Sequence, residues 1–222
     1  MTQPAVDDPP AARPTTLGRF VASRVTAWQR DYTRRRPQAL ATLARLRRGI
    51  GKDVGALPEL WQYTLDGLPG PAPRDGDPPS WTEQAAYTAL TLFALHQQSR
   101  REEMHQPGQS LGTAVRLLKS RATSEEAVRR RFEALGTAET FSEIVHHARG
   151  LITQLRGEAI PLDYGMLTED LFRLQTSAAA RVRLQWGRDF HRATHSQAQD
   201  PTGDQDSPPA ATAAPTDDDE ET

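Results

Sequence analysis

Apolar residues recur along most of this chain at the spacing of an α-helix. At 3.6 residues per turn, the apolar residues between Leu17 and Tyr32 fall on one face, and segment 139–156 carries an unbroken apolar stripe. No stretch alternates with a period of two beside turn residues, so no β-strand is predicted. The pattern therefore predicts an all-α protein.

Residues that start and stop helices divide this pattern into about seven or eight helices. Pro37 suits the first turn of a helix, and Gly49 suits its end. Ser80 and Glu83 have the spacing of a capping box, in which the two side chains bond each other's backbone amides. The predicted helices cover 17–35, 37–48, 58–65, a segment opening at Ser80, 111–120, a segment opening at Thr123, 139–156 and 164–192.

The chain divides into one helical body and two tails. Residues 1–16 and 193–222 lack periodicity and are rich in Pro, Ala, Asp and Thr, a composition typical of disorder. Residues 17–192 hold all the predicted helices, with a Pro- and Gly-rich loop at 67–79. We therefore expect a single bundle-like domain over 17–192, between a disordered N-terminal tail and a disordered acidic C-terminal tail.

Composition excludes several classes of protein. The chain has no cysteine, which rules out disulfides and thiolate metal sites. No apolar run approaches the ~18 residues that cross a bilayer, and the N-terminus lacks the apolar stretch of a signal peptide. We expect a cytoplasmic protein with no membrane partner.

The charges are segregated along the chain. The formal net charge is −2, but residues 17–192 hold 26 Lys and Arg against 19 Asp and Glu, or +7, whereas residues 193–222 hold eight acidic and no basic residues, or −8. All but two of the basic residues are Arg, whose planar guanidinium binds phosphate in a bidentate manner. A basic body of this kind attracts polyanions.

Helical projection places several basic side chains away from the predicted core. Arg130, for example, lies opposite Val128 and Phe132. No helix-turn-helix or other base-reading pattern occurs, so contact with the nucleic-acid backbone fits better than sequence readout. The competing interpretation is that these side chains are solvated faces paired with nearby Glu. The candidate nucleic-acid-binding residues are Arg45, Arg47, Arg48, Lys52, Arg116, Lys119, Arg129, Arg130, Arg131, Arg181, Arg188 and Arg192, which we expect to converge into one electropositive track.

No pattern predicts catalysis, a metal or a cofactor. Two Glu-x-x-His spacings, Glu102 with His105 and Glu143 with His146, are of the type that builds di-iron sites inside helical bundles. Glu143 and His146 project away from the apolar stripe of their helix, which argues against a metal site. No P-loop or nucleophile elbow occurs. We expect a protein that is not an enzyme.

Four segments together resemble a known family. They read ALATLARLRRGIGK (39–52), LHQQSRREEMHQPGQSLGTAVRLL (95–118), RRRFEALGTAETFSEIVHHARGLITQLR (129–156) and LDYGMLTEDLFRL (162–174), the last leading into RVRLQWGRDF (181–190). In order and spacing they resemble the small subunit of the type I-E CRISPR effector Cascade, the CasB family. The resemblance covers about residues 17–192 and leaves out both tails.

The resemblance implies a non-catalytic, all-helical subunit of an RNA-guided DNA surveillance complex in antiviral defence. It implies contacts with the backbone and large subunits, with a second copy of the chain, and with the guide RNA and target DNA, including the displaced strand of the R-loop. It maps family basic positions onto a set that adds Arg183 to the candidates: Arg47, Arg48, Arg116, Arg130, Arg131, Arg183 and Arg188. An assembly-only scaffold, whose basic patches bind neighbouring protein subunits, is the alternative function.

Overall fold

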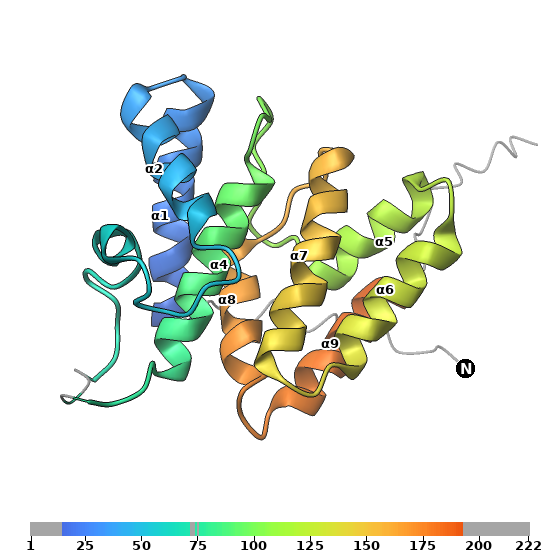
Figure 1. Cartoon of the computed structure of the whole chain (residues 1–222). Helices are drawn as coiled ribbons and strands as arrows, with labels where there is room; N and C mark the ends of the chain where they lie inside the picture. Colours follow the sequence, from blue (N-terminus) through green and yellow to red (C-terminus); the bar gives the residue numbers. More distant parts are fainter. Residues whose placement is uncertain (1–14, 72–73, 75, 193–222) are drawn as a thin grey trace, which may run out of the picture. The chain divides into compact units, whose positions relative to one another are not determined.

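The structure is a computed structural model that describes residues 15–71, 74 and 76–192 (Figure 1). The two tails that the sequence predicts to be disordered lie outside the described residues, except for Thr15 and Thr16. Thr16 already belongs to the first helix, so the helical body begins one residue before the predicted position.

The described residues form nine α-helices, one short 3-10 helix and no β-strand, which confirms the all-α prediction. Their bounds are α1 Thr16–Thr33, α2 Pro37–Arg48, η1 Pro58–Leu60, α3 Trp61–Thr64, α4 Trp81–His96, α5 Leu111–Arg121, α6 Glu125–Thr137, α7 Phe141–Gly157, α8 Tyr164–Arg173 and α9 Ala179–His191. An isolated bridge joins His105 to Leu162. None of the described helices has the length and apolar content needed to cross a membrane.

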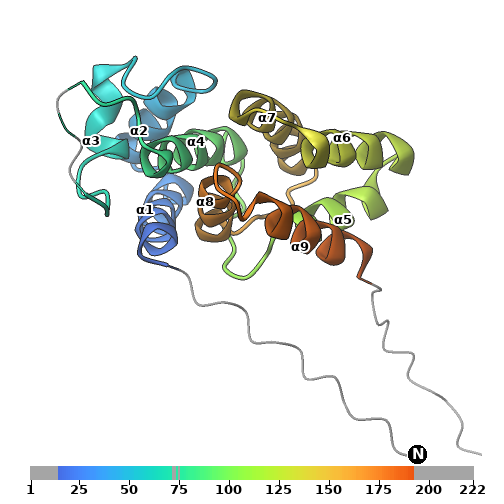
Figure 2. The same ribbon diagram turned by 90° about the horizontal axis from the view of Figure 1, so that it is seen from below.

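The helices pack in two neighbouring groups within the described body. The helices α1, α2, α4 and α8 contact one another, and α5, α6, α7 and α9 form the second group (Figures 1 and 2). Helix α4 lies between them because it contacts α2 and α8 on one side and α7 on the other. It is correspondingly buried along nearly its whole length, with eleven buried residues.

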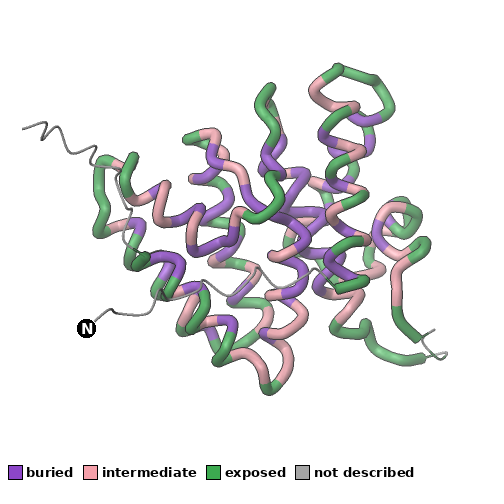
Figure 3. Tube along the Cα trace, turned by 180° about the vertical axis from the view of Figure 1, so that it is seen from behind, coloured by how far each residue is buried: buried purple, intermediate pink, exposed green. Residues whose placement is uncertain are grey.

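The core follows the apolar stripes expected from the sequence. Val21, Leu43, Phe93 and Leu151 are fully buried, and the buried positions recur along the inner faces of the helices (Figure 3). The capping box predicted at Ser80 is present, since its hydroxyl accepts the Glu83 amide and the Glu83 carboxylate accepts the Ser80 amide at 2.7 Å.

The prediction of one helix over 164–192 is wrong, because the segment forms α8 and α9 with a turn between them. The indole Nε1 of Trp186 donates a hydrogen bond to Asp170 Oδ2 at 2.7 Å. In a continuous helix these two residues would be about 24 Å apart. The turn lets α8 pack against α1 and α4 while α9 packs against α5.

Candidate nucleic-acid interface

Helix α9 is fixed against the N-terminus of α5. Ser110 caps α5 by accepting the Thr113 amide at 3.2 Å, and the same hydroxyl donates to Asp189 of α9 at 2.7 Å. A Cβ atom at Gly112 would lie 2.8 Å from the Cβ of Asp189, so only glycine permits this close approach. The sequence thus sets the position of α9 through small and polar residues on α5.

Helices α6 and α9 both pack against α5, touch each other through two side-chain contacts, and run in opposite directions. The rings of Phe132 and Phe190 are 4.8 Å apart between centroids. Farther along, the guanidinium of Arg183 donates to the carbonyl of Ala138, just after α6, at 2.7 Å. These two contacts join the end of α9 to the middle of α6, and the start of α9 to the end of α6. The basic residues carried by the two helices therefore lie on adjacent elements.

The three consecutive arginines of α6 are all exposed, as the helical projection predicts. Arg129 pairs with Glu126, one turn earlier, and this hydrogen bond raises the pKa of Arg129. Within the described part of the chain, Arg130 and Arg131 have no ion-pair partner. Their guanidinium groups are free to donate to phosphate oxygens.

Helix α9 adds two further exposed arginines. Arg181 and Arg188 are exposed and form no ion pair with any residue that the structure describes. Arg192 lies 3.7 Å from Asp189, which offsets part of its charge. Arg183 is half-buried and bonds Ala138, so its main contact stabilises the α6–α9 packing.

The predicted basic residues of α5 lie between these helices and are half-buried. Arg116 donates to the backbone carbonyl of Arg192 at 3.4 Å. The ammonium of Lys119 lies 5.4 Å from the centroid of the Phe190 ring and 4.0 Å from Glu125. Both side chains therefore help to attach α9 and α6 to α5. Together α5, α6 and α9 hold nine Arg and Lys against four Asp and Glu, a local net charge of +5.

The structure does not bring the α2 cluster together with these residues. Helix α2 packs against α1, α4 and η1, in the other group of helices (Figure 2). Arg45 donates to the Tyr63 hydroxyl at 3.0 Å, and Arg48 pairs with Glu59 at 2.8 Å, so both hold the η1–α3 segment. Arg47 is half-buried, and Lys52 is exposed in the following loop. The single track expected from the sequence is thus divided into two separate basic groups.

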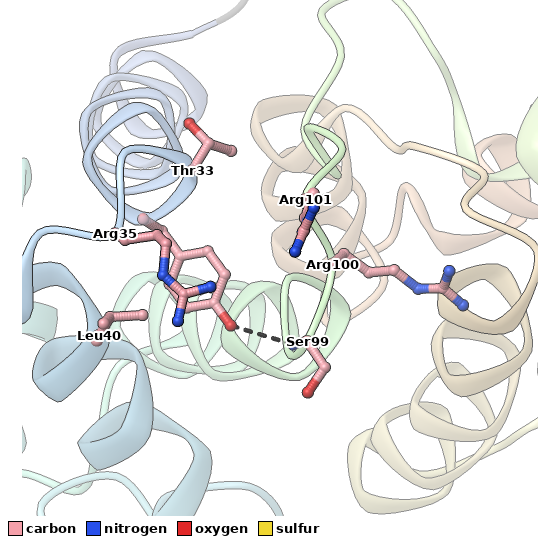
Figure 4. Close-up of a pocket in the computed structure, with 7 residues that line it drawn as sticks. Thr33, Arg35, Leu40, Ser99, Arg100 and Arg101 are labelled. Carbon is pink, nitrogen blue, oxygen red and sulfur yellow. Dashed lines mark hydrogen bonds between the residues drawn. The ribbon is translucent and has the colours of Figure 1, made fainter.

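Two further basic residues, which the helical projection does not select, lie in loops. Arg35 falls inside the predicted helix 17–35, but α1 ends at Thr33, so the projection gives no true direction for its side chain. Arg35 and Arg101 belong to the α1–α2 turn and to the loop after α4, and both line a cavity (Figure 4). The run Arg34–Arg36 in the sequence was the signal that could have drawn attention to the first of these loops.

The residues of the two Glu-x-x-His spacings have other contacts. The Glu143 carboxylate accepts the amides of Thr140 and Glu139 at the start of α7, and these hydrogen bonds lower the pKa of Glu143. His105 is buried in the loop between α4 and α5, where its Nδ1 lies 3.1 Å from the Tyr164 amide. Among the described residues, no three His, Cys, Asp or Glu side chains come together in a metal-binding arrangement.

The fold and this surface define an all-helical protein with exposed arginines on two adjacent helices. The chain belongs to the family of the CRISPR-associated protein Cse2, whose family model matches residues 42–191.

Two solved structures share the fold. One is the crystal structure of CasB from Thermobifida fusca, whose sequence is 43% identical to this chain. Its TM-score is 0.69, and the match covers 80% of this chain and 99% of that one. A Cse2-family protein from Thermus thermophilus is 23% identical, with a TM-score of 0.60 over 79% of this chain and 98% of that one, and this likeness shows the fold alone. A comparison with curated proteins gives no match.

Proposed function

We propose that this chain is a non-catalytic subunit of a type I-E Cascade complex. It binds nucleic-acid backbone and stabilises the R-loop, the guide–target hybrid with its displaced DNA strand. Membership of the Cse2 family supports a place in a CRISPR effector. The observation that carries the binding role is the set of exposed arginines without ion-pair partners among the described residues of α6 and α9, namely Arg130, Arg131, Arg181 and Arg188.

The mechanism is electrostatic. Guanidinium groups on adjacent helices neutralise phosphates and release counterions, and such contacts carry no sequence information. R-loop formation is close to energetically balanced, so a few contacts with the displaced strand shift it toward the open state. The partners are the guide RNA, the target DNA, the backbone and large subunits of the complex, and a second copy of this chain.

The four arginines can be removed without disturbing the core, since the side chain of none of them bonds another described residue. We expect the combined change of Arg130, Arg131, Arg181 and Arg188 to Gln to lower R-loop yield by on the order of tenfold, because four phosphate contacts are lost. The measurement is R-loop formation on a target duplex by the complete complex carrying the variant. The matched control changes four exposed arginines elsewhere, Arg19, Arg34, Arg74 and Arg149, to Gln.

The same experiment separates this role from that of an assembly-only scaffold. If the basic surface binds neighbouring subunits, the α6–α9 variant will fail to copurify with the complex. If it binds nucleic acid, the variant complex will assemble and only R-loop yield will fall. An assembled variant complex with the R-loop yield of the wild type contradicts the proposed function.

A further inference from the structure

A cavity of about 590 Å³ lies between the α1–α2 turn and the loop after α4. It is outside the α6–α9 surface, since it is formed by residues near α1, α2 and the end of α4. Figure 4 shows Arg35 and Arg101 reaching it from the two different loops. The lining residues are Tyr32, Thr33, Arg35, Leu40, Ser99, Arg100 and Arg101.

The first wall is built by an unusual end to α1. The amides of Arg35 and Arg36 donate to the carbonyls of Tyr32 and Asp31 at 2.8 and 2.9 Å, which is the hydrogen-bond pattern of a Schellman motif. The left-handed position of this motif is commonly Gly, but here it is Arg35, with φ of 56°. A non-glycine residue in this conformation has a higher backbone energy than glycine would have. A binding role for the Arg35 side chain would account for the arginine at this position.

The second wall is held to the first by a direct hydrogen bond. Ser99 also has a left-handed backbone, with φ of 61°, and its amide donates to the Tyr32 hydroxyl at 3.1 Å, drawn as the dashed line in Figure 4. This bond joins the end of α1 to the loop after α4. Arg101, two residues after Ser99, lies across the cavity from Arg35 in Figure 4.

The charge of the cavity is uncompensated. Its lining includes three arginines and no carboxylate. Arg100 donates to the carbonyl of Gly157, the last residue of α7, at 2.6 Å, and its side chain extends away from the cavity in Figure 4. Within the described ranges, no ion pair or side-chain hydrogen bond engages Arg35 or Arg101. Two guanidinium groups thus remain for an anion, whereas the Thr33 hydroxyl donates to the Arg30 carbonyl at 3.0 Å.

We propose that this cavity binds a phosphate group through Arg35 and Arg101. Paired guanidinium groups recognise the oxygens of a phosphate in a bidentate manner. A cavity of this size falls in the range that accepts a small molecule, and the exposed side chain of Leu40 offers an apolar surface beside the charges. The phosphate comes either from a nucleic-acid chain, which rests on the proposed function, or from a free phosphate compound.

The binding of phosphate itself is tested on the isolated full chain by thermal unfolding. A ligand of about 1 mM affinity, present at about 20 mM, raises the melting temperature of a protein of this size by roughly 4 °C. We expect inorganic phosphate to do so relative to chloride at equal ionic strength, and the double variant R35G/R101Q to lose the shift. Gly suits the left-handed backbone at position 35, so this variant is expected to keep its stability in chloride.

The matched control is R19Q/R34Q, which removes two exposed arginines outside the cavity and should keep the full shift. If R35G/R101Q does not fold, the single variant R101Q is expected to weaken phosphate binding about tenfold. The proposal is overturned if phosphate gives no shift beyond that of chloride, or if the cavity variants respond as the wild type does.

A second measurement separates the two sources of phosphate. Short single-stranded oligonucleotides with and without a 5′-phosphate are compared as competitors for the inorganic phosphate effect. Competition by both shows that an internal phosphodiester enters the cavity, whereas competition by inorganic pyrophosphate alone shows a free phosphate compound. The α6–α9 Gln variant should retain the thermal shift, so failure of the proposed function leaves this result unchanged.

Discussion

Buried polar side chains connect helices that are far apart in the sequence. Glu169 on α8 accepts the Gly18 amide at 2.8 Å and the Thr15 hydroxyl, so it caps the N-terminus of α1 across 151 residues. His96 is fully buried against the Tyr164 hydroxyl at 3.0 Å, and burial lowers the pKa of His96 to about 3. No local pattern predicts such contacts, because each partner lies outside the window in which periodicity and capping are recognised.

The carboxyl of Asp170 gives the fold a testable pH dependence. Burial raises the pKa of Asp170 to about 7, against the opposing hydrogen bond from Trp186 and the charge of Arg173. The folded state therefore holds this proton to higher pH than the unfolded state, so the contribution of Asp170 to stability falls as pH rises from about 4 to about 7. His96 acts in the opposite direction, because its pKa is lower in the folded state than in the unfolded state. Its contribution to stability is therefore lost as pH falls below about 6.5.

Replacing Asp170 with Asn isolates the contribution of Asp170 to the pH dependence of stability. Asn is neutral at all pH values and can still accept the Trp186 indole proton. We expect the free energy of unfolding of Asp170→Asn, relative to wild type, to rise by about 2–3 kcal/mol between about pH 5 and about pH 8. Urea unfolding at a series of pH values measures this difference, and His96 cancels because both proteins contain it. Parallel stability profiles would show that Asp170 does not titrate in this range.

At the scale of elements, the positions of most helices could be predicted, and their partners could not. Amphipathic spacing locates α1 to within two residues, and the Ser80 capping box locates the start of α4. Helix α2 ends at Arg48, as predicted from Gly49, yet Gly49 is not left-handed. Glycine is needed there because a Cβ would lie 2.6 Å from Leu60 and from the Tyr87 hydroxyl. The division of 164–192 into two helices was missed because it depends on which neighbours α8 and α9 contact.

The close approach of α5 and α9 predicts a large effect for Gly112→Ala. The added methyl would overlap the Trp186 carbonyl and lie 2.8 Å from the Asp189 Cβ, so backbone must move. We expect a net loss of about 1–3 kcal/mol in the free energy of unfolding, despite the better helix propensity of Ala. The control is Gly150→Ala in α7, where no described atom lies within 4 Å of the new methyl apart from the chain neighbours and the helix's own backbone, and a gain of up to ~1 kcal/mol is expected. Equal effects of the two changes in chemical denaturation would contradict this account of the α5–α9 contact.

At the scale of the whole molecule, the sequence predicts which basic side chains are exposed better than where they gather. The helical projection predicts that Arg130, Arg131, Arg181 and Arg188 are exposed, and they are. It could not show that side chains of α6 and α9 contact each other, or that α2 lies in the other group of helices. It also said nothing of Arg35, whose direction depends on a left-handed turn. Exposure follows from local periodicity, whereas a binding surface depends on tertiary contacts.

The proposed surface makes a quantitative prediction about salt. Each phosphate contact with single-stranded nucleic acid contributes about −0.7 to the slope of log K against log salt concentration. Changing Arg181 and Arg188 to Gln should therefore reduce the steepness of that slope by about 1.4 as well as weakening binding, if both arginines contact phosphate. Fluorescence anisotropy of a labelled oligonucleotide, titrated at several low salt concentrations, gives the slope for the isolated chain. The R19Q/R34Q chain carries the same charge change and should keep the wild-type slope, so net charge alone would not account for the difference. A slope that is equally reduced in both variants would mean that the protein attracts nucleic acid through its overall charge, and that α9 is not a specific contact surface.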